Sequence, residues 1–281
     1  MWHANRLGAR IGNLRTHMSR LRAGELDSTP PEDRTDDEIG ELREAIAEAT
    51  ERLAAVYNSQ ERMIADAAHE LRTPLAALRA EIDVALRRER SAEQLRESLG
   101  HARVEVERLG TLSSHLLDLA ALRASPIRRE RVDMVGILVE AIDAARALAE
   151  TRGCVVRLET PERAPAEIAA AALRQALDNL LSNAIKYAPP GSSIEVELRR
   201  NGAQNTWEFN VRDRGPGIPA DAREAVFEPF FTVNDEAQTA NQGAGLGLAI
   251  VKDTAVRHGG SVALRPRSGG GSIFTLTLPD G

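Results

Sequence analysis

A histidine stands in the middle of a long helical pattern, with a carboxylate and a hydroxyl close by. Glu70 follows His69 directly, and Thr73 lies four residues on, on the same helix face. At about 100° per residue, His69 lies roughly 200° from Ala67 in the apolar seam, so its ring is directed to solvent. Imidazole is a nucleophile and a proton carrier near neutral pH. The group favours such chemistry, and an ordinary surface histidine is the alternative.

Two asparagines four residues apart mark a second candidate site. Asn179, Asn183 and Tyr187 drift by only about 40° per step, so they share one helix face, with Lys186 beside them. A neutral amide oxygen suits Mg²⁺ that already carries water and phosphate oxygens. A lysine offsets phosphate charge, and a tyrosine ring can lie against a base. Taken alone, the same residues could be a polar outer face.

Two glycine-rich segments follow the asparagines. The first contains Asp213 and comes after a strand pattern, and the second opens a helix. Their glycines are Gly215, Gly217, Gly243, Gly245 and Gly247. A carboxylate can accept from the adenine amine, and glycines let backbone N–H groups approach phosphate. A dinucleotide motif needs an apolar strand before it, but residues 239–242 are polar, and no Gly-Lys-Ser/Thr of a P-loop follows.

The segment His69–Leu75 (HELRTPL) resembles the phosphoacceptor box of two-component sensor histidine kinases. The resemblance implies that His69 takes the γ-phosphoryl group of ATP as a phosphoramidate. It implies that Glu70 is the base that holds the other ring nitrogen, and that Thr73 positions water for dephosphorylating the partner. The implied enzyme is a protein histidine kinase that passes its phosphoryl group to an aspartate of a response-regulator receiver domain, and that also acts as a phosphatase of that regulator.

The order of the later motifs carries a second resemblance. An asparagine helix, Asp-x-Gly-x-Gly, Phe227–Phe231 and a glycine loop are similar to the ATP-binding domain of histidine kinases, Hsp90-like chaperones and type II topoisomerases. The histidine helix upstream disfavours the chaperones and the topoisomerases. The resemblance implies ATP and Mg²⁺ as cofactors, with Asn183 on the metal and Asp213 on the adenine amine. The implied nucleotide-binding residues are Asn179, Asn183, Lys186, Tyr187, Asp213, Gly215, Gly217, Gly243, Gly245 and Gly247.

The segment between Phe231 and Gly243 departs from the family pattern. It contains no Lys or Arg, whereas the family often places a basic residue there to meet the γ-phosphate. Asp235 and Glu236 would repel a triphosphate if they pointed inward. The alternative function is therefore a kinase-weak dimeric relay or phosphatase scaffold that binds nucleotide. A plain coiled-coil dimerisation module leaves the glycine segments unexplained.

Narrow apolar seams run through the first half of the chain. Their residues alternate in steps of four and three over 7–21, 39–85 and 95–119. Such a stripe is buried only against partner helices, so we expect a parallel homodimer whose hairpins form a four-helix bundle. The first two seams, the proline-containing connector between them and the segment Asp37–Leu42 resemble a HAMP signal-relay domain.

After residue 126 the periodicity changes to a mixture of helices and strands. We expect helices at about 133–151, 165–187 and 246–258, and strands at about 154–159, 194–198, 207–211, 261–264 and 273–278. Asn201-Gly202 predicts a hairpin between two of the strands. The predicted fold is mainly α plus α/β: a parallel coiled-coil HAMP domain (1–57), a dimeric helical hairpin (58–124) and an α/β sandwich ATP-binding domain (125–281).

Composition limits the possible partners. The 281 residues are 42% hydrophobic and 28% charged, as in folded proteins, and the net charge of −6 offers no basic field to nucleic acid. One cysteine, Cys154, excludes an internal disulfide. No window approaches about 18 uninterrupted apolar residues. Because HAMP domains usually follow a transmembrane helix, the resemblance implies the cytoplasmic portion of a bacterial inner-membrane sensor, attached through a segment absent from this sequence.

Overall fold

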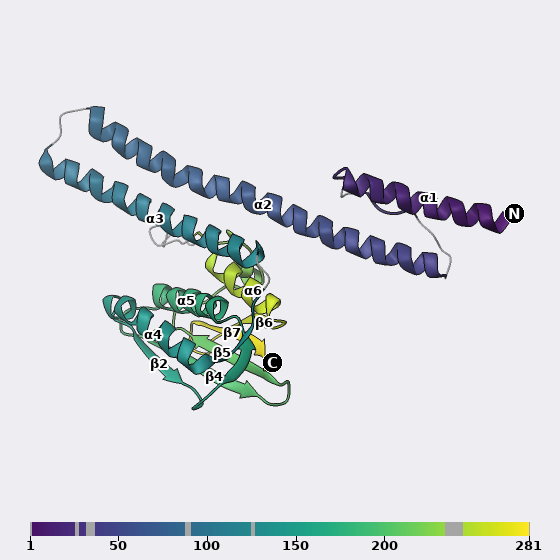
Figure 1. Ribbon diagram of the computed structural model, residues 1–281. Coiled ribbons are helices and arrows are strands. Elements are labelled where there is room, and N and C mark those ends of the chain that lie inside the picture. The colour runs from purple at the N-terminus through teal and green to yellow at the C-terminus, as the bar shows by residue number, and fades with distance from the viewer. Residues whose placement is uncertain are drawn as a thin grey trace. The chain divides into compact units, whose positions relative to one another are not determined.

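A computed structural model describes residues 2–25, 28–31, 37–87, 91–124, 127–233 and 244–280. The chain divides into two compact units, Met1–Ala68 and His69–Gly281. Three long helices come first, α1 (Trp2–Arg22), α2 (Glu38–Arg87) and α3 (Ala92–Ala124) (Figure 1). Their bounds agree with the three predicted seams. Within the described ranges, no helix combines the length and the apolar composition that a membrane span requires.

Polar contacts tie α1 to the start of α2 in the first unit. The guanidinium of Arg10 donates two hydrogen bonds of 2.6 Å to the Asp37 carboxylate, which also accepts from the Gly40 N–H at 3.0 Å. The Arg10 bond holds the pKa of the Asp37 carboxyl well below its usual range. Deeper in the unit, buried His17 lies between the hydroxyls of Ser28 and Thr50. Asp37 therefore caps α2 and fixes α1 beside it at the same time.

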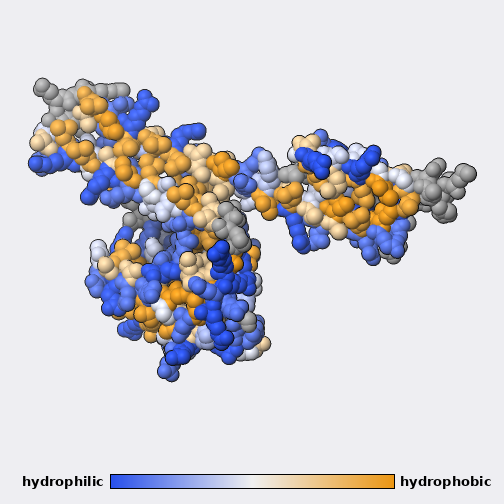
Figure 2. All heavy atoms as spheres, in the orientation of Figure 1, coloured by the Kyte–Doolittle hydropathy of each residue, from blue (hydrophilic) through white to orange (hydrophobic). Residues whose placement is uncertain are grey.

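The seams of α2 and α3 are only partly covered within one chain. Exposed apolar side chains occur along both helices: Leu53, Val56, Ile64, Leu75, Ile82, Leu95, Leu99 and Val106. Figure 2 shows apolar surface along these helices. A single chain thus leaves the predicted seams without a full set of partners.

The rest of the chain forms a sheet with helices on one face. The five-stranded sheet has the order β2-β4-β5-β7-β6, in which β2 runs parallel to β4 and the other pairs are antiparallel. Its strands are β2 (Val155–Glu159), β4 (Ser193–Asn201), β5 (Thr206–Arg212), β6 (Ser261–Pro266) and β7 (Ser272–Pro279). Its helices are α4 (Met134–Thr151), α5 (Ala170–Tyr187) and α6 (Gly247–Arg257), with short 3₁₀ turns η1 (Ala220–Ala222) and η2 (Ala225–Phe227) between β5 and α6. Side chains of the helices and of alternate strand positions form one apolar core.

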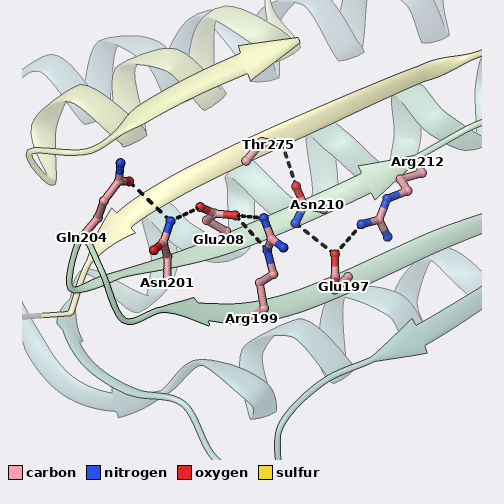
Figure 3. Close-up of polar contacts among 8 residues, drawn as sticks. All are labelled: Glu197, Arg199, Asn201, Gln204, Glu208, Asn210, Arg212 and Thr275. Carbon is pink, nitrogen blue, oxygen red and sulfur yellow. Dashed lines mark hydrogen bonds and ion pairs between the residues drawn. The ribbon is translucent and has the colours of Figure 1, made fainter. Parts of the chain in front are cut away.

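The other face of the sheet is satisfied by its own polar pairs (Figure 3). Arg199 donates to Glu208 at 2.6 Å, and Asn210 donates to Glu197 at 3.1 Å and accepts from the Thr275 hydroxyl at 2.7 Å. Glu208 and Asn210 are buried by these neighbours. The cross-strand partners are oppositely charged or hydrogen-bonded to each other. This face of the sheet therefore needs no second covering layer.

One expectation about this domain is wrong. We predicted a helix opening at Pro165, but Pro165–Ile168 is strand β3, which pairs antiparallel with β1 (Glu130–Asp133). Ala166 and Ile168 are buried while their neighbours are exposed, which is the two-residue period of a strand. Helix α5 starts only at Ala170. The predicted hairpin at Asn201-Gly202 is confirmed between β4 and β5.

The Asp133 side chain caps α4 and also holds the segment before β3. Its carboxylate accepts from the N–H of Val135 at 3.1 Å and from the N–H of Ala164 at 2.9 Å. Asp133→Ala leaves both donors without this acceptor, and the loss of such a cap costs about 1–2 kcal/mol. We therefore expect the Tm of the α/β domain to fall by about 2–8 °C.

Fluorescence of buried Trp207 in a Trp2→Phe background reports the unfolding of this domain. The matched control is Asp143→Ala, which removes an exposed carboxylate from the same helix. It should change the Tm by no more than about 1 °C. Equal shifts for the two variants would contradict the capping role of Asp133.

Candidate active site

His69, Glu70 and Thr73 lie on one stretch of α2. His69 is exposed, as its helical phase predicted, and Glu70 beside it is half-buried. The Thr73 hydroxyl donates to the His69 carbonyl at 3.4 Å, one turn back along the helix. The group therefore presents an accessible imidazole next to a carboxylate, with a hydroxyl one turn away.

One cavity, lined by the α/β domain and by Thr111, Ser114, His115 and Asp118 of α3, brings together most of the residues that we singled out for nucleotide binding. We call it the α5 cavity, and its lining includes Asn179, Asn183, Lys186, Tyr187, Asp213, Gly217, Gly245 and Gly247. Gly215 is not part of this lining, and neither are His69, Glu70 and Thr73. Gly243, Asp235 and Glu236 lie outside the described residues.

Helix α5 supplies the polar wall of the cavity because its opposite side is buried in the core. The Asn179 amide donates to the Gln175 carbonyl at 2.9 Å, which directs its Oδ1 toward Gly247. Lys186 Nζ lies 5.0 Å from the centre of the Tyr187 ring. Burial lowers the pKa of Lys186 to about 8 and raises the pKa of Tyr187.

Asp213 is held rigidly at the end of β5. Its Oδ1 accepts from the Gly215 N–H at 2.7 Å and from the Ser272 N–H at 3.2 Å. Both bonds go to the same oxygen, which leaves Oδ2 as the acceptor available to a ligand in the cavity. The side chain is only 5% exposed, and this burial raises the pKa of the Asp213 carboxyl.

The turn between β6 and β7 supports Asp213, and sequence reasoning missed it. Arg267 donates to the Asp213 carbonyl at 3.2 Å and to the Glu195 carboxylate at 2.6 Å, and its hydrogen bond lowers the pKa of Glu195. A Cβ at Gly271 would lie 2.2 Å from the Asp213 carbonyl oxygen. The run of three glycines before Ser272 could have indicated this contact, because glycines are typical of a backbone that passes close to another part of the chain.

The glycine loop begins α6 at the far side of the cavity. Gly245 has a φ of 67°, and its carbonyl accepts from the N–H of Phe230 at 3.0 Å. A Cβ at Gly247 would lie 2.6 Å from Asn179 Oδ1. Nearby, Phe227 packs edge-to-face on Phe274, with 6.4 Å between the ring centres. The N-terminus of α6 therefore opens next to the asparagine face of α5.

The donor set fits a magnesium ion that arrives with phosphate. In the part of the chain that the structure describes, no cluster of three or more His, Cys, Asp or Glu side chains could hold a metal by itself. Asn183 offers the cavity a neutral amide, while Asn179 Oδ1 is turned toward Gly247. Mg²⁺ commonly keeps waters and phosphate oxygens as most of its ligands, so one amide is a suitable protein contribution.

Three family models match successive parts of the chain. A HAMP domain matches residues 4–55, and a His Kinase A (phospho-acceptor) domain matches residues 59–125. A histidine kinase-, DNA gyrase B- and HSP90-like ATPase matches residues 169–281.

Two curated relatives are similar to the chain over most of its length. Sensor protein CutS of Streptomyces coelicolor is 34% identical over 279 residues, which are 98% of this chain and 66% of that protein. Sensor-like histidine kinase SenX3 of Mycobacterium tuberculosis is 36% identical over 218 residues, 77% of this chain and 53% of that protein. The chain thus spans between about half and two thirds of the length of these relatives.

Solved structures share the fold. Histidine kinase AdeS of Acinetobacter baumannii has a TM-score of 0.59 at 23% identity, and covers 76% of this chain and 98% of its own. Full-length ShkA in complex with AMPPNP has a TM-score of 0.56 at 26% identity, and covers 78% of this chain and 45% of its own. Histidine kinase ThkA in complex with response regulator TrrA has a TM-score of 0.67 at 21% identity, and covers 87% of this chain and 68% of its own.

The two hydrogen bonds to Asp213 Oδ1 allow the structural role of this carboxylate to be tested separately from the role of its free oxygen, Oδ2. Asp213→Asn keeps an Oδ1 that accepts from both N–H groups but removes a buried charge. Asp213→Ala leaves both donors unsatisfied, at a cost of about 1–3 kcal/mol. We expect the Tm of the Asn variant to match or exceed that of the wild type at pH 7, and the Tm of the Ala variant to fall.

The raised pKa of Asp213 determines how the stability difference between Asp213→Asn and the wild type changes with pH. Below the ordinary value of 3.8, the carboxyl is neutral in both folded and unfolded chains, so its burial carries no charge penalty. The stability gained by Asp213→Asn should therefore appear as the pH rises above 3.8 and be complete above the raised pKa. A Tm difference that shrinks over this range would contradict the burial argument.

Proposed function

The chain belongs to the sensor histidine kinases of two-component systems, and on this premise we propose that it transfers the γ-phosphoryl group of ATP to His69. The phosphoryl group then passes to an aspartate of a response-regulator receiver domain. The observation that carries the proposal is the α5 cavity, which combines an amide face, a buried carboxylate and a helix N-terminus, in a chain that also presents an exposed histidine beside a half-buried carboxylate.

Each wall of the α5 cavity suits one part of ATP. Oδ2 of Asp213 accepts from the exocyclic amine of adenine, and the Tyr187 ring lies against the base. Asn183 holds Mg²⁺, with Asn179 supporting it, and Lys186 contacts phosphate. The backbone at Gly245 and Gly247, at the N-terminus of α6, faces the phosphate chain. Gly215, Gly217 and Gly243 complete the assignment: the first two support the Asp213 loop, and the third continues the phosphate loop.

The proposed transfer moves the γ-phosphoryl group of ATP to one ring nitrogen of His69. One ring nitrogen of His69 attacks the γ-phosphorus, the bond from that phosphorus to the bridging oxygen breaks, and ADP leaves. Glu70 accepts a hydrogen bond from the other ring nitrogen, which keeps the lone pair on the attacking one. Asn183 would hold Mg²⁺, and the bound ion would neutralise charge on the phosphate oxygens. In the phosphatase reaction, Thr73 positions the water that hydrolyses the phosphoryl group from the regulator.

The proposed partners follow from the helices and the matched domains. The exposed seams of α2 and α3 need a second copy, so the active form is a homodimer. ThkA is crystallised with a response regulator, and we assign a partner of the same class to this chain. The HAMP match supports attachment to a bacterial inner membrane through a segment outside this sequence, with these domains on the cytoplasmic side. The three matches also support domains at 1–57, 58–124 and 125–281.

Phosphoryl incorporation from γ-labelled ATP with Mg²⁺ tests the proposal. The wild type should take up label that is acid-labile and alkali-stable, because a phosphoramidate has that stability. His69→Gln should take up none. The matched control His101→Gln, which replaces an exposed histidine of α3, should label normally. Asp213→Asn should remain folded and fail to label.

If the wild type binds ATP but takes up no label, the kinase proposal is wrong. The phosphatase scaffold then becomes the better description, with Asp235 and Glu236 as the residues that oppose transfer.

The pKa of Lys186 predicts how ATP affinity depends on pH. The ammonium is charged below about 8 and attracts phosphate, and that attraction is lost as the pH rises through this value. Bound phosphate raises the pKa, so affinity should fall from pH 8 upward, by at most about tenfold per pH unit. Lys186→Arg should abolish this fall, and Lys186→Gln should bind weakly at every pH. An unchanged pH profile in the Gln variant would assign the effect to another group.

A further inference from the structure

A buried histidine joins the end of α6 to the beginning of α5. His258 is 2% exposed, its Nδ1 lies 2.7 Å from the Thr254 carbonyl, and its Nε2 lies 3.0 Å from the N–H of Ala169. A carbonyl only accepts and a backbone N–H only donates. These partners therefore assign a neutral ring with its proton on Nδ1.

The bond to Ala169 serves a position that cannot cap itself. Ala169 is the N-cap residue of α5 and has no side-chain acceptor. The first N–H groups of a helix have no partners inside it, and a buried one without an acceptor is costly. His258 supplies the acceptor from a different helix, across 89 residues of sequence.

A second close contact joins the N-terminus of α6 to the middle of α5. There the backbone of Gly247 passes so near Asn179 Oδ1 that no side-chain carbon fits between them. The two contacts are separated by eleven residues of α6 and ten of α5, which is about 15–17 Å along either helix. The helices therefore run antiparallel and contact each other at two points, one at each end of α6.

We propose that His258 is a positioning residue for the nucleotide site: its neutral ring fixes how far α6 lies along α5. It thereby holds the N–H groups at the start of α6 beside the asparagine face. A slide of one residue, about 1.5 Å, is not compatible with a hydrogen bond whose useful range ends near 3.2 Å. The inference rests on the proposed function, because it assigns His258 to ATP binding by the α5 cavity.

Protonation of His258 would undo this arrangement. A proton on Nε2 would face the Ala169 N–H, so two donors would meet and the bond would break. The charged groups acting on the ring are Arg129, whose guanidinium donates to the Arg257 carbonyl at 3.1 Å, and Arg257 itself. Burial first, and then these two cations, lower the pKa of His258. The ring stays neutral at pH 7, and its acceptor is lost only in acid.

Two variants separate positioning from simple packing. His258→Gln keeps an amide oxygen that can accept from the Ala169 N–H, whereas His258→Leu has similar bulk and no acceptor. We would measure the Kd of Mg·ATP by calorimetry on the full chain, and the Tm without nucleotide. We expect the Leu variant to bind at least about tenfold more weakly than the Gln variant, with Gln near the wild type. Leu264→Ala, which removes packing on β6, should lower the Tm and leave the Kd unchanged.

The pH profile gives a second readout that a packing role would not move. Wild-type affinity should fall as the pH drops through the lowered pKa of His258, and His258→Gln should lack this fall. This comparison decides the matter even if the Leu variant does not fold. Equal Kd values for folded Leu and Gln variants, or identical pH profiles for Gln and wild type, would overturn the inference. A wild type that does not bind ATP would instead overturn the proposed function, and the inference with it.

Discussion

The burial of one side of α5 is the constraint on which the rest of the α/β domain depends. Leu177, Leu180, Leu181 and Ile185 have no exposed surface, and together they occupy a single face of the helix. Each such side chain contributes about 1.5–3 kcal/mol on burial. Any rotation of α5 that moved Asn179 away from the cavity would expose these side chains at a cost of several kcal/mol. The core therefore sets the direction of the polar face.

Close backbone approaches extend that constraint from α5 to the neighbouring loops. Gly215 lies against the Tyr187 carbonyl, Gly247 against Asn179, and Gly271 against the Asp213 carbonyl. Sequence reasoning explained Gly215 and Gly247 by the approach of phosphate, and it did not single out Gly271. The structure gives one reason for all three positions, because the neighbour in each case is another part of the protein. The glycines assemble the cavity wall, and ligand access is a consequence of that assembly.

The features that the sequence predicted are those with a local pattern. The 3.6-residue period located the polar face of α5, Asp133 located the start of α4, and Asn201-Gly202 located a hairpin. Strand β3 was missed because four alternating residues are too short to outweigh a proline that commonly opens helices. The support of Asp213 by Arg267 spans 54 residues. No local period carries a contact of that kind, so it requires the folded chain.

The helical half and the α/β half are stabilised in different ways, and the difference bears on the accessibility of His69. The α/β half buries its core within one chain and pairs the charges on its open sheet face. Along α2 and α3, by contrast, Leu75 and Leu99 are 52% and 69% exposed. A second copy would bury this seam, and His69 points away from it, roughly 200° around the helix from Ala67. In the proposed homodimer, pairing through one face of α2 would therefore stabilise the hairpin and leave the imidazole on the other face accessible.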